Sequence, residues 1–338
     1  MSRMLRTVMG MAVLAAVAAL TAPASAQTLA GEKAVAIPAI AGVTATGAQW
    51  DLAWAGLMTA DGMVGTDDGG LLFAQEQSNS IRKLTADGQE QIYLSGVAGA
   101  GAVSIDAKGR LFTVERTCTD PGLNMPSCAE LTRVVQLAPE RRLLANSFAD
   151  GRTLGRLNDV MADGLGGAYF TVGGVYRASA DGKVSVVTEG DGIFTNGLVL
   201  SPDGKTLYVT NRTTIMAFDV RGDGSTANRR DFASLDKEEG GFGGDGMAVD
   251  NQGRLYVTAA AGIYVFDKGG AQLGIIPTPR PAITLAFSGP GKQTLYVGTM
   301  GAVGPDGKAW TTPKGVRNVA MTIYRMKTLA TGFKGRPK

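Results

Sequence analysis

Four short oxygen-bearing side chains recur at one place in a repeated sequence pattern. Asp61, Asn158 and Asn196 each stand 12 positions before an aromatic residue of that pattern, and Asp245 stands 11 before. If these two carboxylates and two amides converged, the carboxylates would repel each other unless a cation lay between them. Oxygen-only ligands favour a hard divalent cation, with Ca²⁺ first and Mg²⁺, Mn²⁺, Fe²⁺ or Zn²⁺ as alternatives. The aromatic residues that follow them are Phe73, Phe170, Tyr208 and Tyr256.

The composition narrows the chemistry that these residues could perform. The sequence contains no histidine. This excludes a Ser-His-Asp triad, a Cys-His pair, a His-ligated zinc site and a His general base. Catalysis would therefore use carboxylates, a metal ion, or Lys, Tyr and Arg. Asp and Asn are also common in turns, so a turn role is the alternative for each residue taken singly.

The repeated pattern itself predicts the fold. It consists of a Gly turn, an apolar residue, an aromatic residue and then small or β-branched residues, and its aromatics are 39, 58, 38, 48 and 40 positions apart. A period near 40 residues is typical of one four-stranded propeller blade. We therefore expect an all-β fold, a six-bladed β-propeller of four-stranded antiparallel blades around a central channel, with an irregular β-sandwich as the alternative. The six aromatics are Phe73, Phe112, Phe170, Tyr208, Tyr256 and Tyr296.

The symmetry of a propeller predicts where the four oxygen-bearing side chains lie. Twelve positions before the aromatic residue is the start of the innermost strand, so the four side chains would face the channel from four directions. We expect residues 28–50 to pair with residues 321–324 and close the ring.

The N-terminus predicts export. Arg3 and Arg6 give a basic start, residues 8–20 are apolar but too few to span a bilayer, and residues 24–26 (ASA) form a cleavage pattern. We expect residues 1–26 to be a cleaved signal peptide of a bacterial periplasmic or secreted protein. Residues 27–330 would form the single propeller domain and residues 331–338 a basic C-terminal tail. An uncleaved membrane anchor is the alternative.

Charge and cysteine content agree with an exported protein that binds something small. Loss of Arg3 and Arg6 would lower the formal net charge from +3 to about +1, which offers no electrostatic attraction to nucleic acid or anionic lipid. We expect a small-molecule partner, no membrane association after cleavage, and a monomer. The two cysteines, Cys118 and Cys128, are expected to form a local disulfide in an oxidising compartment.

Several motifs resemble the senescence-marker-protein and gluconolactonase family. Residues 156–160 (RLNDV) with 167–171 (GAYFT) are similar to one blade of that family. Residues 195–198 (TNGL) with 201–209 (SPDGKTLYV) resemble the next blade, and 245–250 (DGMAVD) with 253–257 (GRLYV) the one after. The similarity spans about residues 56–300. It implies a six-bladed propeller whose usual chemistry is metal-dependent hydrolysis of sugar lactones.

The resemblance also implies roles for single residues. Asn196 and Asp245 fall on metal-ligand positions, Asn158 on a position that contacts metal or substrate, and Arg156 on a substrate-contact position. The family's first ligand is a Glu in an E-G-P turn, whereas this sequence has DGM at residues 61–63. Asp61 is one methylene shorter, which puts its direct coordination in question. In the second blade, residues 115 and 116 (ER) stand where relatives often have Glu and His. We expect a structural role for these two residues, with a place at the channel rim as the alternative.

The function implied by the resemblance is hydrolysis of a sugar-type or related lactone. The ion would act as a Lewis acid on the lactone carbonyl, and Asp245 would be both ligand and general base toward the attacking water. Arg156 and Asn158 would orient the substrate and stabilise the developing oxyanion. Two alternatives stay open, an aryl-ester or phosphotriester hydrolase at the same metal, and a non-catalytic periplasmic binding propeller with a structural Ca²⁺.

Overall fold

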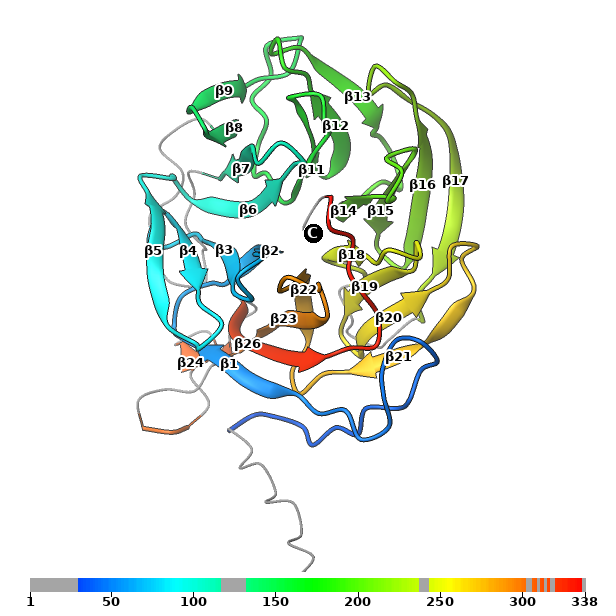
Figure 1. Ribbon diagram of the computed structural model, residues 1–338. Coiled ribbons are helices and arrows are strands. Elements are labelled where there is room, and N and C mark those ends of the chain that lie inside the picture. Colours follow the sequence, from blue (N-terminus) through cyan, green and yellow to red (C-terminus); the bar gives the residue numbers. More distant parts are fainter. Residues whose placement is uncertain are drawn as a thin grey trace, which may run out of the picture.

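Six four-stranded antiparallel sheets surround a central channel (Figure 1). The computed structural model describes residues 30–116, 132–236, 243–301, 306–308, 311–312, 315–316 and 320–335. These residues contain no helix, and therefore none that could cross a membrane. The prediction of an all-β six-bladed propeller is confirmed. The predicted signal peptide and the Cys118–Cys128 disulfide lie outside the described residues.

The first three blades follow one another along the chain, and in each the first strand is innermost. The innermost strands of neighbouring blades contact each other and so line the channel. Blade 1 consists of β2 (Asp61–Gly65), β3 (Leu71–Gln75), β4 (Ser80–Leu84) and β5 (Glu90–Ser95). Blade 2 consists of β6 (Ala100–Ile105), β7 (Leu111–Glu115), β8 (Arg133–Ala138) and β9 (Arg142–Ala145). Blade 3 consists of β10 (Val160–Ala162), β11 (Ala168–Val172), β12 (Gly174–Ala178) and β13 (Val184–Thr188).

The last three blades have the same order, and blade 6 closes the ring with an N-terminal strand. Blade 4 consists of β14 (Thr195–Leu200), β15 (Thr206–Asn211), β16 (Thr214–Val220) and β17 (Thr226–Ser234). Blade 5 consists of β18 (Met247–Val249), β19 (Leu255–Ala259), β20 (Gly262–Phe266) and β21 (Gln272–Pro277). Blade 6 consists of β22 (Ala282–Ser288), β23 (Thr294–Met300), β26 (Ala320–Lys327) and β1 (Asp51–Ala55). A separate pair, β24 (Thr311–Thr312) and β25 (Gly315–Val316), lies between β23 and β26 in the chain.

The closing strand is not the one expected from the sequence. The prediction that residues 28–50 pair with residues 321–324 is wrong, because β1 takes that place as the outermost strand of blade 6. Its register joins Leu52 to Tyr324 and Ala55 to Thr322. Residues 30–50 instead run along the outside of the ring (Figure 1), where they form the short bridge between Ile40 and Thr44 and isolated backbone hydrogen bonds, such as that from the Lys33 amide to the Pro279 carbonyl at 2.9 Å. A strand can pair only where the chain brings it to the edge of a blade. Residues 30–50 lead the chain to the edge of blade 6, and β1 is the segment that pairs there.

The repeated aromatic residues form the packing core between blades. All six lie in the second strand of their blade, and five of them are completely buried. Tyr208 is the sixth and is 7% exposed. Because side chains alternate along a strand, an aromatic at this position points into the layer between two sheets. The repeated aromatic residues of the sequence therefore mark the buried positions at which neighbouring blades pack together.

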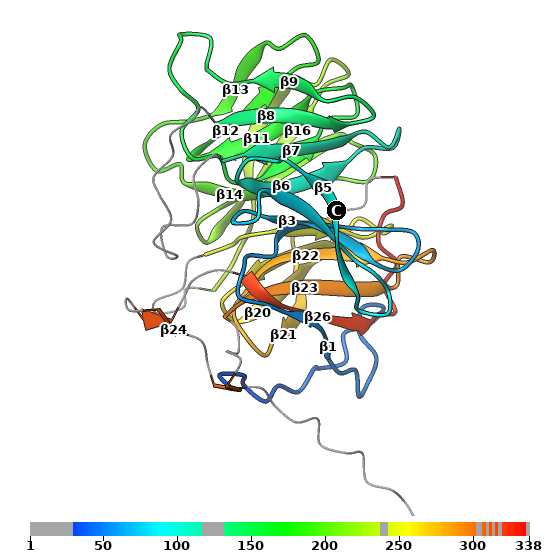
Figure 2. The same ribbon diagram turned by 90° about the vertical axis from the view of Figure 1, so that its left-hand side faces the viewer.

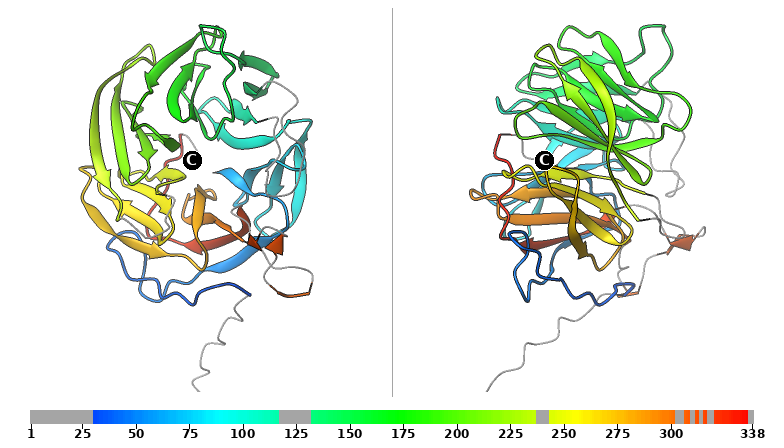
Figure 3. Two further views of the ribbon diagram at one scale, coloured as in Figure 1. Left: turned by 180° about the vertical axis from the view of Figure 1, so that it is seen from behind. Right: turned by 90° about the vertical axis from the view of Figure 1, so that its right-hand side faces the viewer.

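The two ends of the channel differ. All innermost strands start at one end, here called the mouth, and β24 lies on that side in Figure 2. The view from behind in Figure 3 looks onto the mouth. At the opposite end the chain after β26 crosses the channel, where the Asn251 amide donates to the Thr331 carbonyl at 2.8 Å and the Gly332 amide to the Lys292 carbonyl at 2.8 Å. The mouth is thus the end at which the predicted site residues stand.

Candidate metal centre

The four predicted ligand residues lie together at the mouth. Asp61 and Asn196 are in the first two residues of β2 and β14, whereas Asn158 and Asp245 stand two residues before β10 and β18. All four line one small cavity, here called the mouth cavity, with a volume of about 10 Å³. That is room for one water molecule or one ion. The other lining residues are Gly62, Gly101, Ala102, Asp159, Gly246, Ile283 and Thr284.

Each of these side chains is placed by an irregular start of its inner strand. The register of β2 with β3 shifts between Asp61 and Val64, and β14 shows a similar shift around Asn196. Such bulges turn a side chain out of the regular alternation of a strand and are frequent next to active sites. Asn158 and Asp245 lie just before the regular pairing, with their backbone amides bonded to the second strand. The irregular backbone is what brings the four polar groups to one point.

Threonines of neighbouring blades fix these backbones. The Thr171 hydroxyl donates to the Asn196 carbonyl at 2.6 Å, and the Thr210 hydroxyl donates to the Asp245 carbonyl at 3.3 Å. Both threonines are completely buried. Blade 3 therefore holds the site residue of blade 4, and blade 4 holds that of blade 5.

A hydrogen-bond chain links the polar groups around the mouth cavity. Arg116 Nη2 donates to Asn158 Oδ1 at 3.0 Å, and Asn158 Nδ2 donates to Asn196 Oδ1 at 2.7 Å. The side chain of Asn196 is in turn hydrogen-bonded to Asp245. Because each amide has one donor end and one acceptor end, the guanidinium at the start of the chain sets the orientation of both amides.

Asp245 carries a strongly perturbed carboxyl group. Burial raises the pKa of Asp245 well above its ordinary value, and the nearby carboxylates of Asp61 and Asp159 raise it further. Arg116 and the hydrogen bond from Asn196 oppose this shift. A carboxylate in this position would be stabilised by a further positive charge.

The structure adds a buried carboxylate that the sequence analysis missed. Glu76 directly follows β3 and is 1% exposed. Its two oxygens accept from Arg156 at 2.9 and 3.0 Å, and Oε2 also accepts from Arg116 at 3.2 Å. A signal was available, because Glu76 stands three residues after Phe73 in the same phase as Glu115 after Phe112. Both glutamates stand at the mouth end of the second strand of their blade, Glu76 directly after β3 and Glu115 as the last residue of β7.

Glu115 and Arg116, the two second-blade residues considered for the channel rim, make different contacts in the structure. Glu115 pairs with Arg133 at 3.4 Å and with Arg141, away from the mouth cavity. Arg116 turns inward, is 6% exposed and contacts Asp61 and Glu76. Burial lowers the pKa of Arg116, but these two carboxylates outweigh burial and the net shift is upward. Arg116 is therefore a permanent cation beside the predicted ligands.

Arg156 and Asp159 are two further charged residues around the mouth cavity. Arg156 is held by Glu76, yet 42% of its side chain is exposed. Asp159 is 7% exposed and accepts from the Val160 and Leu198 amides at 2.8 and 3.3 Å. When all four acids are ionised, four acids and two arginines give the mouth cluster a formal charge of about −2. The acids are Asp61, Glu76, Asp159 and Asp245, and the arginines are Arg116 and Arg156.

These residues fit a hard divalent cation. In the part of the chain that the structure describes, no group of three or more His, Cys, Asp or Glu side chains is placed to hold a metal. The mouth cavity instead combines the two predicted carboxylates and the two amides with the carboxylate of Asp159, all of which can offer oxygen ligands. Its volume suits one ion, and a divalent cation would balance the two surplus negative charges. Both the donor chemistry and the charge agree with such an ion.

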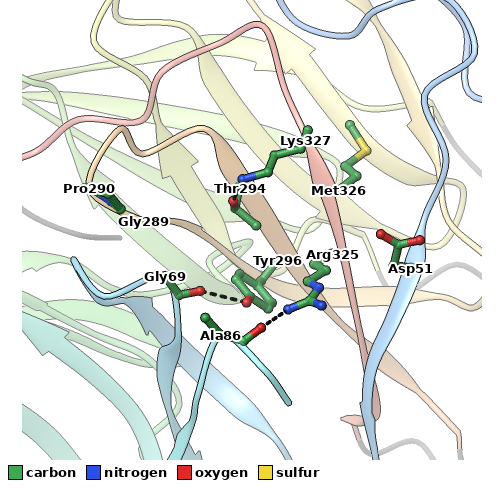
Figure 4. Close-up of a pocket in the computed structure, with 10 residues that line it drawn as sticks. All are labelled: Asp51, Gly69, Ala86, Gly289, Pro290, Thr294, Tyr296, Arg325, Met326 and Lys327. Carbon is green, nitrogen blue, oxygen red and sulfur yellow. Dashed lines mark hydrogen bonds between the residues drawn. The ribbon is translucent and has the colours of Figure 1, made fainter.

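A second cavity lies at the opposite end of the propeller (Figure 4). It has a volume of about 310 Å³ and lies between blades 1 and 6. Its polar groups bond within the fold, since Tyr296 donates to the Gly69 carbonyl at 2.9 Å, Arg325 donates to the Ala86 carbonyl, and Lys327 donates to Thr294 at 2.8 Å. None of the predicted site residues lies there. The chemistry is concentrated at the mouth.

Comparison with known proteins agrees with this geometry. The model of the SMP-30/Gluconolactonase/LRE-like region matches residues 59–301, which include every mouth residue described above. A gluconolactonase of Zymomonas mobilis is 27% identical over 267 residues, which cover 67% of this chain and 72% of that protein. The resemblance inferred from the sequence motifs is confirmed.

Solved structures share the fold. A gluconolactonase of Xanthomonas campestris superposes with a TM-score of 0.65 at 22% identity, covering 90% of this chain and 99% of that one. A calcium-binding protein of Agrobacterium tumefaciens, regucalcin, superposes with a TM-score of 0.58 at 17% identity, covering 81% and 91% of the two chains. At these identities the similarity concerns the propeller architecture.

Proposed function

Since the chain belongs to the SMP-30/gluconolactonase/LRE-like family, we propose that it is a hydrolase that opens a sugar-type or related lactone and depends on one divalent cation. The observation that carries this proposal is the mouth cavity, where four oxygen-bearing side chains meet around room for one ion. The name of the Zymomonas mobilis relative supports the lactone as substrate class. Ca²⁺ is the first choice of ion, because the candidate ligands are all oxygens.

Asn196 and Asp245 would hold the ion, with Asn158 and Asp61 beside them. When bound, such an ion supplies Lewis acidity toward the lactone carbonyl. The protein's own contribution is to hold these groups rigidly, through the bulged strand starts and the buried threonines. Rigid placement matters because a polar group that is already oriented need not reorganise during the reaction.

Asp245 acts as the general base. One carboxylate oxygen takes a proton from the water that attacks the lactone carbonyl carbon, and the ring C–O bond then breaks. The ring oxygen leaves as the hydroxyl of the open-chain hydroxy acid when Asp245 gives it the proton that it took from water. Arg156 and Asn158 donate hydrogen bonds to substrate oxygens, and the exposed part of Arg156 is available for this.

The setting of the reaction is also a proposal. The basic and apolar N-terminus with its ASA pattern supports export to the periplasm or outside the cell. The near-neutral charge after cleavage supports a small uncharged or weakly charged substrate and gives no reason for nucleic-acid or membrane binding. We propose a monomer.

The test measures bound metal and δ-lactone hydrolysis on one purified sample, before and after chelation. We expect about one divalent ion per chain and loss of lactone hydrolysis on chelation, restored by Ca²⁺. A panel with aryl esters and phosphotriesters identifies the substrate class. Bound metal without hydrolysis of any of these compounds would instead favour the binding propeller.

The matched variant is Asp245→Asn, which keeps the shape of the side chain but cannot act as a base. We expect turnover to fall by roughly 10²–10⁴-fold, the usual contribution of a general base. Asp219→Asn is the control, because Asp219 lies in the outer part of blade 4 and pairs only with exposed groups. Full activity in Asp245→Asn would remove Asp245 from the mechanism.

A further inference from the structure

Arg116 occupies an unusual place for a cation beside a candidate metal centre. It follows β7, is 6% exposed, and places its guanidinium beside Asp61 and Asn158 of the mouth cavity. Its Nε donates to the Leu157 carbonyl at 2.9 Å and its Nη2 to the Asn158 carbonyl at 3.0 Å. These backbone contacts anchor the group between blades 2 and 3. Arg116 is therefore a fixed part of the site and not a mobile rim residue.

The guanidinium already neutralises Asp61. Asp61 Oδ1 accepts from the Gly62 amide at 2.8 Å, and Asp61 Oδ2 lies 3.3 Å from Arg116 Nη2. Both oxygens of this short side chain therefore have partners within the protein. The other acid that contacts Arg116 is Glu76, which Arg156 holds through two further hydrogen bonds. Apart from Arg116, Asp61 has only the Gly62 amide as a described partner, whereas Glu76 also has Arg156. Of the two acids, Asp61 therefore depends more on Arg116.

Arg116 also orients the amides on the far side of the cavity. Its Nη2 donates to Asn158 Oδ1, which turns Asn158 Nδ2 toward Asn196 Oδ1. A donor facing Asn158 Oδ1 competes with a metal for that oxygen. Arg116 therefore donates hydrogen bonds to two of the four candidate ligands, Asp61 and Asn158. Among the described hydrogen bonds, none joins Arg116 to Asn196 or Asp245.

We propose that Arg116 is a built-in counter-ion of this site, and that Asp61 acts through its ion pair with Arg116 and not as a direct metal ligand. Asn196 and Asp245 are then the protein ligands of the divalent cation. Arg116 is a positioning residue that lowers the affinity for the cation and orients Asn158. This inference rests on the proposed cation dependence of the site.

The test is a double-variant cycle in which cation affinity is measured by calorimetry on metal-free protein, with Ca²⁺ and Mn²⁺ as probes. Asp61→Asn leaves Arg116 unpaired beside the cation, so we expect the Kd to rise roughly tenfold through charge repulsion. Arg116→Gln leaves Asp61 unpaired, so we expect the Kd to fall by roughly the same factor. Together, D61N and R116Q remove one charge of each sign, so the double variant should return to within about threefold of the wild-type Kd.

Two further variants separate charge from structure. Arg116→Lys keeps the charge and should keep a wild-type-like Kd even where thermal unfolding shows lower stability. Arg177→Gln breaks the ion pair with Asp163 at the opposite end of blade 3 and should leave the Kd unchanged. The double variant leaves neither partner of the Asp61–Arg116 pair unmatched, so it remains informative if Arg116→Gln alone does not fold.

The outcomes distinguish this inference from the proposed function. A double variant as weak as Asp61→Asn would identify Asp61 as a direct ligand and overturn the inference, while leaving the cation site in place. An unchanged Kd in folded Arg116→Gln would also overturn it. Wild-type protein that binds no divalent cation would overturn the proposed function and, with it, the inference.

Discussion

At the scale of single residues, the mouth concentrates carboxylates that the fold cannot neutralise by itself. Asp245 shows this most directly, since burial and the charges of Asp61 and Asp159 raise its pKa. Arg116 and Arg156 balance only part of the acidic charge. Residues needed for binding or catalysis are often held in environments that cost stability. The first of the following two predictions tests that cost, and the second tests the buried ion pairs that offset it.

In chelator-treated protein at pH 8, we expect Asp245→Asn to melt at a higher temperature than the wild type. The substitution removes a repelling charge, and a gain of 1 kcal/mol corresponds to roughly 2–4 °C in a protein of this kind. Because the pKa of Asp245 is raised, its ionisation costs stability as pH rises through that pKa, and the cost vanishes below about pH 4. The difference in melting temperature should therefore shrink as the pH is lowered from 8 toward 5. A variant that melts below the wild type at pH 8 would contradict this account.

Glu76→Gln should be strongly destabilising, because it removes the shared partner of two arginines at a buried position. We expect the free energy of unfolding to fall by about 3–5 kcal/mol, the usual cost of breaking a buried ion pair. Denaturant unfolding measures it. Glu90→Gln makes the same chemical change in the more exposed pair with Arg82 and should cost about 1 kcal/mol or less. Equal losses in the two variants would show that burial of Glu76 is not the cause.

At the scale of elements, the site depends on how closely the starts of the inner strands approach one another. A Cβ on Gly197 would lie 2.1 Å from the Asp245 carbonyl oxygen, and a Cβ on Gly62 would lie 2.3 Å from the Ala102 Cα. Glycine is needed at both points because neighbouring backbone fills the space that a side chain would require. The bulged strand starts and these contacts together set the spacing of the polar groups.

We therefore expect Gly197→Ala to displace β14 from the loop that carries Asp245. The displacement should raise the cation Kd at least tenfold and lower stability by about 1–3 kcal/mol, as overpacking usually does. Calorimetry and thermal unfolding measure the two effects. Gly222→Ala is the matched control, since a Cβ there meets nothing within 4 Å. A Gly197→Ala variant with wild-type affinity would show that the strand starts can shift without disturbing the site.

At the scale of the whole molecule, two segments hold the ring of blades closed, β1 on its outside and the segment after β26 at the end opposite the mouth. The strand β1 completes blade 6, and Trp54 in it packs against Phe73 of blade 1 with ring centroids 5.4 Å apart. At the end opposite the mouth, the segment after β26 crosses the channel and contacts blades 5 and 6. Closure at this end stabilises the ring, and none of the described residues after β26 lines the mouth cavity.

A chain that ends after Ala330 should therefore lose stability and keep its cation site. It lacks the hydrogen bonds at Thr331 and Gly332 and the partly buried Phe333. We expect a loss of about 2–4 kcal/mol from these contacts together. Thermal unfolding measures the loss, and calorimetry should give an unchanged cation Kd. Lys334→Ala, at an exposed position, should change neither quantity. Loss of cation binding in the truncated chain would mean that the two ends of the channel are coupled.

The sequence by itself determined the blade count and the meeting of Asp61, Asn158, Asn196 and Asp245. It did so because both depend on local spacing, which repeats with each blade and places equivalent residues at equivalent points around an axis. The closing strand was assigned wrongly, because pairing at a blade edge depends on where the preceding segment leads the chain.

Only the tertiary structure decided how the charges at the mouth are paired. Glu76 meets Arg116 from 40 positions away in the chain and Arg156 from 80 positions away. No local pattern marks which carboxylate a long, flexible arginine reaches, since the choice depends on the neighbours that the adjoining blades place around it. Coulombic attraction depends on distance in space and on burial, and both exist only once the ring has closed.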